Sequence, residues 1–118
     1  METIYQALLT IRAPIGQGEY DLHRLAEAAL TQAGIPWAHE VPLGPHCRID
    51  LLCGTTGIEI KRGKPAPARL KEQLRRYAAC TQIEALIVIA EGAVRLPATL
   101  NGKPVKLLCL NRLWGIAL

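Results

Sequence analysis

Two carboxylates and a lysine lie close together around an expected β-hairpin. Asp50 falls in a strand expected over 47–53, and Glu59 and Lys61 fall in a strand expected over 58–61. The intervening Gly-Thr-Thr-Gly predicts a tight turn, which places Asp50 opposite Lys61. Glu59 shares their face, because side chains alternate along a strand. The other face carries only branched aliphatics: Ile49, Leu51, Ile58 and Ile60.

This trio suits metal-assisted hydrolysis of a phosphodiester. Two carboxylates offer hard oxygen ligands to Mg²⁺, which keeps several waters and contacts the substrate phosphate. The ion stabilises developing charge and helps to generate hydroxide, and Lys61 can orient the water or stabilise the transition state. A solvent-facing ladder of salt bridges would use the same residues. However, the apolar run 85–90 predicts a sheet buried on both sides, where charges require a reason.

The elements that position these residues follow from hydrophobic spacing and from glycine and proline breaks. The sequence predicts α/β organisation, in the order helix, three strands, helix, strand and a further strand. A hairpin followed by a helical crossover predicts a mixed sheet flanked by helices. The expected helices cover 1–12, 19–33 and 68–80, and the expected strands cover 37–43, 47–53, 58–61, 84–90 and 105–111.

The strand pair also carries a recognisable motif. Asp50, eight intervening residues and then Glu59-Ile60-Lys61 resemble the PD-(D/E)xK nuclease superfamily. Ile49 replaces the nominal proline, a substitution that the superfamily tolerates widely. The resemblance covers about residues 19–90, in the helix–strands–helix–strand order of that superfamily.

The resemblance implies a restriction-endonuclease-like αβββαβ core, which we expect over about 19–111 of a single domain spanning 1–118. It also implies that Asp50 and Glu59 bind Mg²⁺, with Mn²⁺ able to substitute, and that Lys61 assists hydrolysis.

Many members of the superfamily carry a further metal-binding glutamate on the first core helix. Glu19, at the expected start of that helix, matches the arrangement in archaeal Holliday junction resolvases. Glu27 is the rival, although it lies in the middle of the helix. A glutamate at a helix N-terminus also interacts favourably with the helix dipole. Glu40 is a lesser candidate, either pointing at the site or simply exposed.

The helix that follows the hairpin carries a second motif. Gln73 and Tyr77 lie four residues apart and therefore share a helix face. They resemble the Q-x-x-x-Y extension of lambda exonuclease and of the RecBCD nuclease domain. In those relatives the glutamine lies near the active site and the tyrosine can touch DNA. Alternatively, Tyr77 packs with Leu70 and Leu74.

Basic residues are concentrated in this same region. The net charge is +4, and seven of the fourteen lysines and arginines lie between Lys61 and Arg76, where Glu72 is the only acid. Such a concentration favours contact with a phosphate backbone, although a solvated helix face would look similar. The expected nucleic-acid contacts are Arg62, Lys64, Arg69, Arg76 and Tyr77.

The remaining composition excludes several classes of site and of protein. The four cysteines, at 47, 53, 80 and 109, lack zinc-hairpin spacing and are expected to be buried free thiols. The three histidines show no ligand spacing. The longest apolar run is too short to span a bilayer, and no secretory signal precedes it. We therefore expect a cytoplasmic protein without a membrane partner.

The resulting hypothesis is a metal-dependent endonuclease acting on double-stranded or branched DNA, with Asp50, Glu59, Lys61 and Gln73 in the catalytic site. A homodimer is possible, with the apolar C-terminus 113–118 as an interface. Two alternatives remain: a catalytically idle DNA-binding or interaction module, and an exonuclease subunit of a larger complex.

Overall fold

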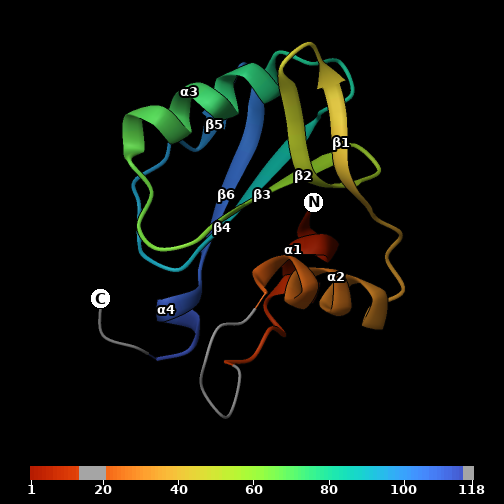
Figure 1. Cartoon of the computed structure of the whole chain (residues 1–118), viewed down its shortest axis with the longest axis vertical. Coiled ribbons are helices and arrows are strands. Elements are labelled where there is room, and N and C mark those ends of the chain that lie inside the picture. The colour runs from red at the N-terminus through yellow and green to blue at the C-terminus, as the bar shows by residue number, and fades with distance from the viewer. Residues whose placement is uncertain (14–20, 116–118) are drawn as a thin grey trace.

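Six strands form one mixed sheet in the order β1-β2-β3-β4-β6-β5, with helices on both faces (Figure 1). The computed structural model describes residues 1–13 and 21–115. The strands are β1 Ala38–Gly44, β2 Cys47–Cys53, β3 Thr56–Lys61, β4 Ala85–Ala90, β5 Thr99–Leu100 and β6 Lys103–Cys109. The helices are α1 Glu2–Leu8, α2 Leu22–Gln32, α3 Pro67–Ala78 and α4 Leu110–Leu113.

The sheet has an antiparallel part and a parallel part. β1, β2 and β3 form an antiparallel meander. β3, β4 and β6 are parallel neighbours, and β5 adds an antiparallel edge to β6. Parallel strands need a crossover connection, and α3 supplies it between β3 and β4.

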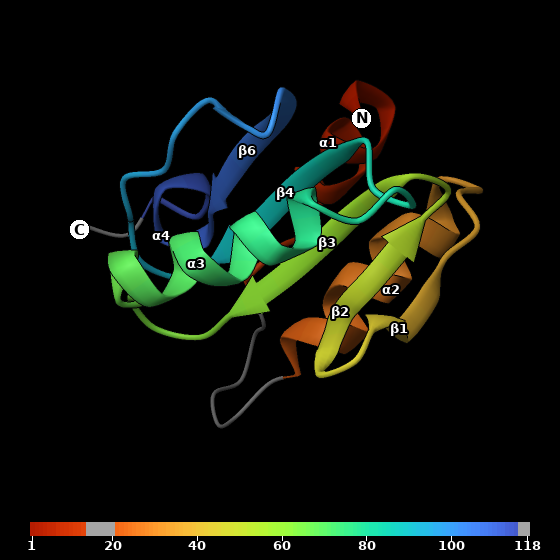
Figure 2. The ribbon, with the colours of Figure 1, turned by 90° about the horizontal axis from the view of Figure 1, so that it is seen from above.

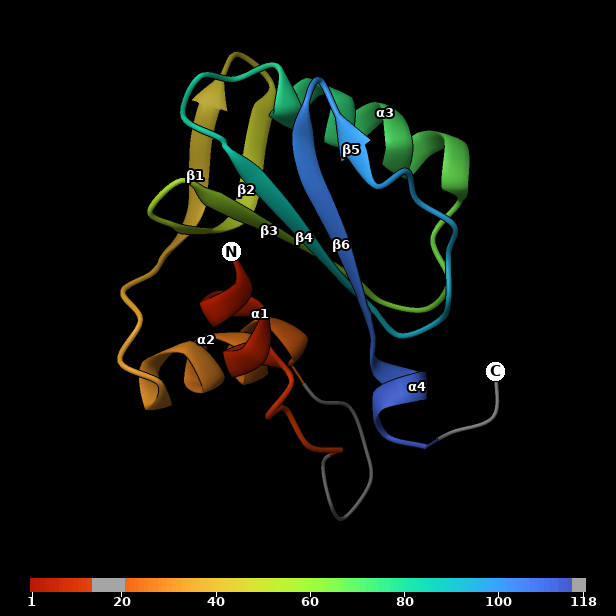
Figure 3. The same cartoon turned by 180° about the vertical axis from the view of Figure 1, so that it is seen from behind.

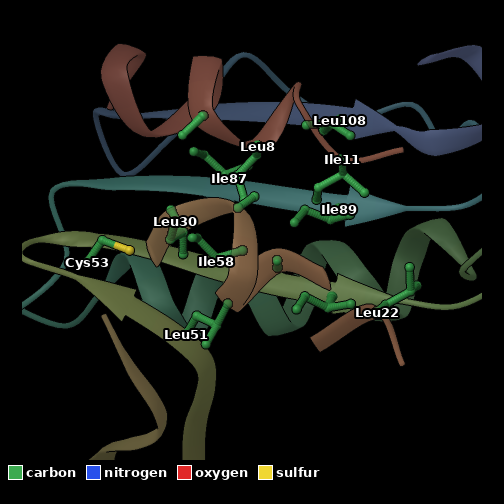
Figure 4. Close-up of a cluster of buried hydrophobic side chains, with 14 of the residues drawn as sticks. Leu8, Ile11, Leu22, Leu30, Leu51, Cys53, Ile58, Ile87, Ile89 and Leu108 are labelled. Atoms are coloured by element: carbon green, nitrogen blue, oxygen red, sulfur yellow. The ribbon is translucent and has the colours of Figure 1, made fainter. Parts of the chain in front are cut away.

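The helices divide the hydrophobic core between the two faces of the sheet. α1 and α2 pack on one face and α3 packs on the other, as the views from above and behind show (Figures 2 and 3). Figure 4 shows the first core, where Leu8 and Leu30 from the helices meet Ile58 and Ile87 from the sheet. All six residues of β4 are buried because both of its faces are covered, which explains its continuous aliphatic sequence.

Local sequence explains where the two long helices begin. Asp21 caps α2, and its carboxylate accepts hydrogen bonds from the backbone N–H groups of His23 and Arg24. Pro67 occupies the first turn of α3, where its missing N–H costs no helical hydrogen bond. Arg75 and Arg76 lie in the last turn of α3, where positive charge interacts favourably with the helix dipole.

Two of the tight hairpins place glycine or asparagine at loop positions with positive φ angles. Gly54 has φ +60° at the first position of the β2–β3 loop, a geometry that glycine adopts without strain. Asn101 (φ +52°) and Gly102 (φ +75°) connect β5 to β6, which is the turn geometry that favours Asn-Gly.

The α/β class and the mixed sheet flanked by helices are confirmed. From α2 to β4 the order is helix, three strands, helix, strand, as expected. Two short elements were not predicted: β5, because two residues carry no periodicity, and α4, because it follows β6 within one apolar run.

The described part of the apolar C-terminus is covered by the chain itself. Leu113 and Trp114 pack against the first core, and the Trp114 indole N–H donates to the Ile11 carbonyl oxygen at 3.0 Å. The core of the chain itself therefore covers part of the surface of these two residues. No helix in residues 1–13 and 21–115 is long and apolar enough to cross a membrane.

The cysteines are free thiols, as predicted. Cys53 and Cys109 are buried, whereas Cys47 and Cys80 are only partly so, which corrects the expectation that all four are buried. Burial raises the pKa of the Cys53 thiol to about 11, so this group stays protonated at neutral pH.

Candidate active site

The β2–β3 hairpin pairs two residues out of step with the predicted register. Cys53 pairs with Thr56 and Leu51 pairs with Ile58, whereas a register with Asp50 opposite Lys61 would pair Cys53 with Ile58. Asp50 and Glu59 still lie close enough for the Asp50 carboxylate to raise the pKa of Glu59. The loop consists of Gly54 and Thr55 rather than of the two threonines, and a two-residue slide keeps the same side chains on the same face.

At Asp50 the strands depart from regular pairing. The recorded β2–β3 register ends at Leu51–Ile58, and the next ladder donor, the Ile60 N–H, donates to Asp50 Oδ2 at 2.8 Å. In a regular ladder that N–H would donate to a backbone carbonyl of β2. The Asp50 carboxylate therefore occupies a ladder position and is fixed by it.

This irregularity also changes the face of Ile49. Ile49 belongs to the core under α3, whereas Leu51 belongs to the core under α1 and α2. Strict alternation would put both on one face, so the prediction of a shared face is wrong for Ile49. On β1, the residue in register with Asp50 is Glu40, which has φ +50°. The distortion therefore extends across both strands.

A glycine leaves room for the displaced isoleucine. A Cβ atom at Gly57 would lie 2.3 Å from Ile49 Cδ1 and 3.0 Å from Ile83 Cδ1. Because real Cβ atoms are not found that close to other carbons, a side chain at 57 would push Ile49 away. Gly57 therefore leaves the space that the Ile49 side chain occupies in the core under α3.

Glu59 is a buried charge with two hydrogen-bonding partners. Its side chain is 4% exposed, and Oε2 lies 3.1 Å from the Lys61 ammonium. Its other oxygen, Oε1, lies 3.0 Å from the Tyr77 hydroxyl. The Lys61 side chain is 30% exposed, so it joins the buried carboxylate to the surface.

Tyr77 links α3 to both strands of the hairpin. Its hydroxyl lies 2.8 Å from the Arg48 carbonyl oxygen and 3.0 Å from Glu59 Oε1, and it accepts a hydrogen bond from the Gln73 amide at 3.0 Å. A hydroxyl has one proton to donate, so Arg48 and Glu59 compete for it. Gln73 and Tyr77 thus form one hydrogen-bonded unit with Glu59.

Tyr77, which the resemblance implies as a nucleic-acid contact, is buried in this structure. The residue is 2% exposed, so it presents almost no surface to a ligand in this conformation. It packs with Leu70 and Leu74 in the core under α3, which was the alternative interpretation. It also contacts Glu59, so its place is within the site and beneath the surface.

The surroundings of Glu59 oppose its ionisation. Burial raises the pKa of the Glu59 carboxyl, and the neighbouring Asp50 carboxylate raises it further, whereas Lys61 and Tyr77 lower it. Burial also raises the pKa of the Tyr77 hydroxyl, with Glu59 as the next cause. A carboxylate whose charge is not fully compensated by its neighbours favours an additional cation.

The donor set fits a hard divalent cation. The carboxylates of Asp50 and Glu59 are close enough to interact electrostatically, and Mg²⁺ is bound through one or two carboxylates while it keeps several waters. Within residues 1–13 and 21–115, no group of three His, Cys, Asp or Glu side chains is arranged to hold a metal. Glu19, the predicted third ligand, lies outside the described residues.

The rival acidic candidates do not contact these carboxylates. Glu27 and Glu40 line a separate hollow of about 430 Å³ between α2 and β1, together with Asp21 and His23. Glu40 pairs with Arg48, its carboxylate 3.2 Å from the guanidinium, and both side chains are more than half exposed.

The predicted basic contacts lie at the surface around α3. Arg62 and Lys64, in the connector after β3, and Arg69 and Arg76, on α3, are all exposed. Arg62 pairs with Glu91 at 3.8 Å. This surface adjoins the site because the connector begins directly after Lys61.

Comparisons with protein-family models, with curated proteins and with solved structures each found no match. Assignment of a function therefore rests on the residues of the site. Sequence reasoning missed the irregular path of β2, the Tyr77–Arg48 contact and the role of Gly57. The unusual glycine inside β3 was a signal for the last of these, since glycine within a strand indicates close packing.

Proposed function

We propose that this protein is a metal-dependent DNA endonuclease, with Asp50 and Glu59 holding Mg²⁺ or Mn²⁺ and Lys61 assisting hydrolysis. The observation that carries the proposal is a buried Glu59 carboxylate beside Asp50, with a partly exposed lysine at its edge. A solvent-facing salt-bridge ladder does not account for it, because Glu59 is 3% exposed. The resemblance to the PD-(D/E)xK superfamily supports the same chemistry.

The bound metal would polarise the scissile phosphate and lower the pKa of a water molecule. The side chains of the chain have distinct parts in this proposal. Asp50 is held in place by the Ile60 N–H, and Glu59 is held by the Tyr77 hydroxyl, to which the Gln73 amide donates in turn. Lys61 reaches the surface beside Glu59, where its ammonium can orient the attacking water and stabilise negative charge in the transition state.

DNA is the proposed substrate because of the exposed basic residues next to the site. The phosphate backbone attracts such a surface without regard to sequence. We propose selectivity for branched or double-stranded DNA, and two protomers would place one site on each strand. Glu19 remains the proposed third ligand.

The first test compares the cleavage of four-way-junction, linear and supercoiled DNA in the presence of Mg²⁺ or Mn²⁺. Asp50→Ala should reduce cleavage by more than about 10³-fold, because it removes a ligand from the metal that stabilises the transition state. Glu84→Ala is the matched control, since Glu84 is an exposed carboxylate on the approach to β4. A chelator should also abolish cleavage by the wild type.

Each of the other outcomes identifies an alternative. Digestion of linear DNA alone, with supercoiled DNA intact, would indicate an exonuclease. A folded wild type that binds DNA but cuts none of the substrates would indicate a catalytically idle binding module. Cleavage that survives Asp50→Ala would contradict the proposed site.

A further inference from the structure

A second cavity, separate from the carboxylate site, lies on the other flank of α3. It has a volume of about 640 Å³ and lies between the start of α3, the segment 93–98, β6 and α4. Three basic side chains line it, those of Lys64, Arg95 and Arg112, and its lining contains no acid. Figure 2 shows α3 lying between β2, which carries Asp50, and β6, which forms a wall of this cavity.

These three cations lack an acidic partner among residues 1–13 and 21–115. Lys64, Arg95 and Arg112 form no ion pair with any residue in the described part of the chain. Some arginines elsewhere pair with neighbouring acids, as Arg48 does with Glu40 and Arg75 with Glu72, whereas Arg69 and Arg76 on α3 form no ion pair with a described residue. Three unpaired positive charges around one hollow repel each other, and a bound anion relieves that repulsion.

The connector that carries Lys64 is held firmly against the end of β4. The Gly63 N–H donates to the Glu91 carboxylate, and the Gly92 N–H donates to the Gly63 carbonyl oxygen at 2.9 Å. A Cβ at Gly92 would lie 3.1 Å from Lys64 Cβ, so glycine permits this close approach. Lys64 is therefore fixed relative to the sheet.

The same connector joins the cavity to the carboxylate site. Lys61 and Lys64 are three residues apart, so their Cα atoms are separated by at most about 11 Å. Successive phosphates of a strand advance by about 3.4 Å along the axis of duplex DNA. If the scissile phosphate of a DNA strand lies at Lys61, a phosphate a few nucleotides further along the same DNA strand could therefore reach Lys64.

We propose that this cavity binds a phosphate group of the nucleic-acid strand that is cut at Asp50 and Glu59, an inference that rests on the proposed function. Arg95 and Arg112 supply planar guanidinium groups, which match phosphate oxygens in pairs. The aliphatic walls, including Val94, Leu96 and Leu107, suit the adjoining sugar. The phosphate is either an internal phosphodiester or a terminal phosphate.

The test measures binding in chelator, where the carboxylate site is not loaded with metal. The probes are a deoxynucleoside 5′-monophosphate and a short single strand without terminal phosphates, titrated by calorimetry and by backbone NMR. In the wild type, the amides of Gly63, Gly92 and Arg95 should shift. Arg95→Gln/Arg112→Gln should weaken binding at least about tenfold. For the single strand, the double substitution should also reduce the magnitude of the slope of log K against log salt concentration by about 1.4.

A matched double variant controls for net charge. Arg24→Gln/Arg75→Gln removes two exposed arginines that already pair with Asp21 and Glu72, so binding should change little. Binding of the mononucleotide identifies a terminal phosphate, and binding of the strand alone identifies an internal phosphodiester. Equal losses in the two double variants, no loss in Arg95→Gln/Arg112→Gln, or no binding of either probe would overturn the proposal.

Failure of this inference is distinguishable from failure of the nuclease. Asp50→Ala should retain full phosphate binding, because Asp50 does not line the cavity. If the protein binds phosphate in the cavity but does not cut DNA, the cavity site stands and the proposed function is wrong. If the protein cuts DNA and the arginine variants bind phosphate as tightly as the wild type, the proposed function stands and the cavity site is wrong.

Discussion

β3 pairs with β4 on one side and with β2 on the other, and the two pairings differ in regularity. Toward β4 it pairs residue for residue from Thr56 to Lys61 without a break. Toward β2 the recorded pairing covers three residues and ends at Ile58, after which a carboxylate side chain receives the next backbone N–H. One strand therefore belongs to a regular parallel sheet on one side and to an opened hairpin on the other.

The difference explains how a buried charge can be held in place without being fully enclosed. The regular side fixes Glu59 and Lys61, because both neighbours on β4, Val88 and Ala90, are buried in the core. The irregular side lets Asp50 leave the alternation of β2 and turn toward the gap between strands. A rigid side and an open side together hold the two carboxylates close enough for Asp50 to raise the pKa of Glu59.

On the regular side, the substitution with the largest effect on cleavage should be the one that removes Lys61. Lys61→Ala should reduce cleavage by about 10²–10³-fold, because it removes a positive charge placed where negative charge develops. The measurement is single-turnover cleavage with saturating metal. Lys106→Ala is the control, since Lys106 also pairs with a glutamate but lies on β6 next to Glu2. Equal rates for the two variants would contradict a catalytic role for Lys61.

Tyr77→Phe tests whether α3 positions the carboxylate of β3. It removes the hydroxyl that contacts Glu59 and the Arg48 carbonyl, so cleavage should fall about 10–100-fold. DNA affinity should stay within about twofold of the wild type, because Tyr77 is buried. Tyr5→Phe removes a comparable hydrogen bond to Leu107, away from the site, and should leave cleavage unchanged. A selective loss of DNA affinity would show that Tyr77 contacts the substrate instead.

Gly57→Ala tests the irregular side directly. The new methyl group would displace Ile49, so we expect a loss of about 1–3 kcal/mol in the free energy of unfolding together with reduced cleavage. Urea denaturation measures the first effect. Gly44→Ala, where a Cβ would meet nothing within 4 Å, should change stability by less than about 0.5 kcal/mol. If the two alanine variants were equally stable, Gly57 would not define the path of β2.

The smallest effect concerns the pH dependence of stability. Burial raises the pKa of Glu59 in the folded state above its ordinary value of 4.5, so the folded protein binds this proton more tightly than the unfolded chain. The stabilisation by Glu59 is greatest below pH 4.5 and declines as pH rises through the folded pKa. Glu59→Gln lacks this dependence.

Urea denaturation in chelator from about pH 4 to about pH 8 measures this pH dependence of stability. The difference in unfolding free energy between wild type and Glu59→Gln should fall as pH rises. Glu84→Gln, at an exposed carboxylate, should show no such trend. A difference that rises with pH would mean that Lys61 outweighs burial.

The regular part of the molecule could be predicted from sequence because its physics is local. The aliphatic run of β4, the Asn101-Gly102 turn and the apolar stripes of α2 and α3 each follow from spacing or backbone preference. The faces of the β3 residues were also predictable, since Ile58 and Ile60 share one core as side-chain alternation requires.

The irregular part depends on contacts between distant segments. The two-residue error in register arose because both Gly54-Thr55 and Thr55-Thr56 can close the loop. The observed loop places Gly54 at the position of positive φ. The face of Ile49 depends on space above Gly57 that Ile83 and Leu86 border, and this contact is not encoded in a window of neighbouring residues.

The most direct test of the site is paramagnetic broadening by Mn²⁺, observed in the backbone NMR spectrum at substoichiometric metal. The amides of Glu59, Ile60 and Lys61 should broaden first in the wild type and should remain sharp in Asp50→Asn. This result would place a divalent cation between the two strands. Broadening centred instead on Glu27 and Glu40, or an unchanged response in Asp50→Asn, would contradict the assignment of Asp50 and Glu59 as the metal site.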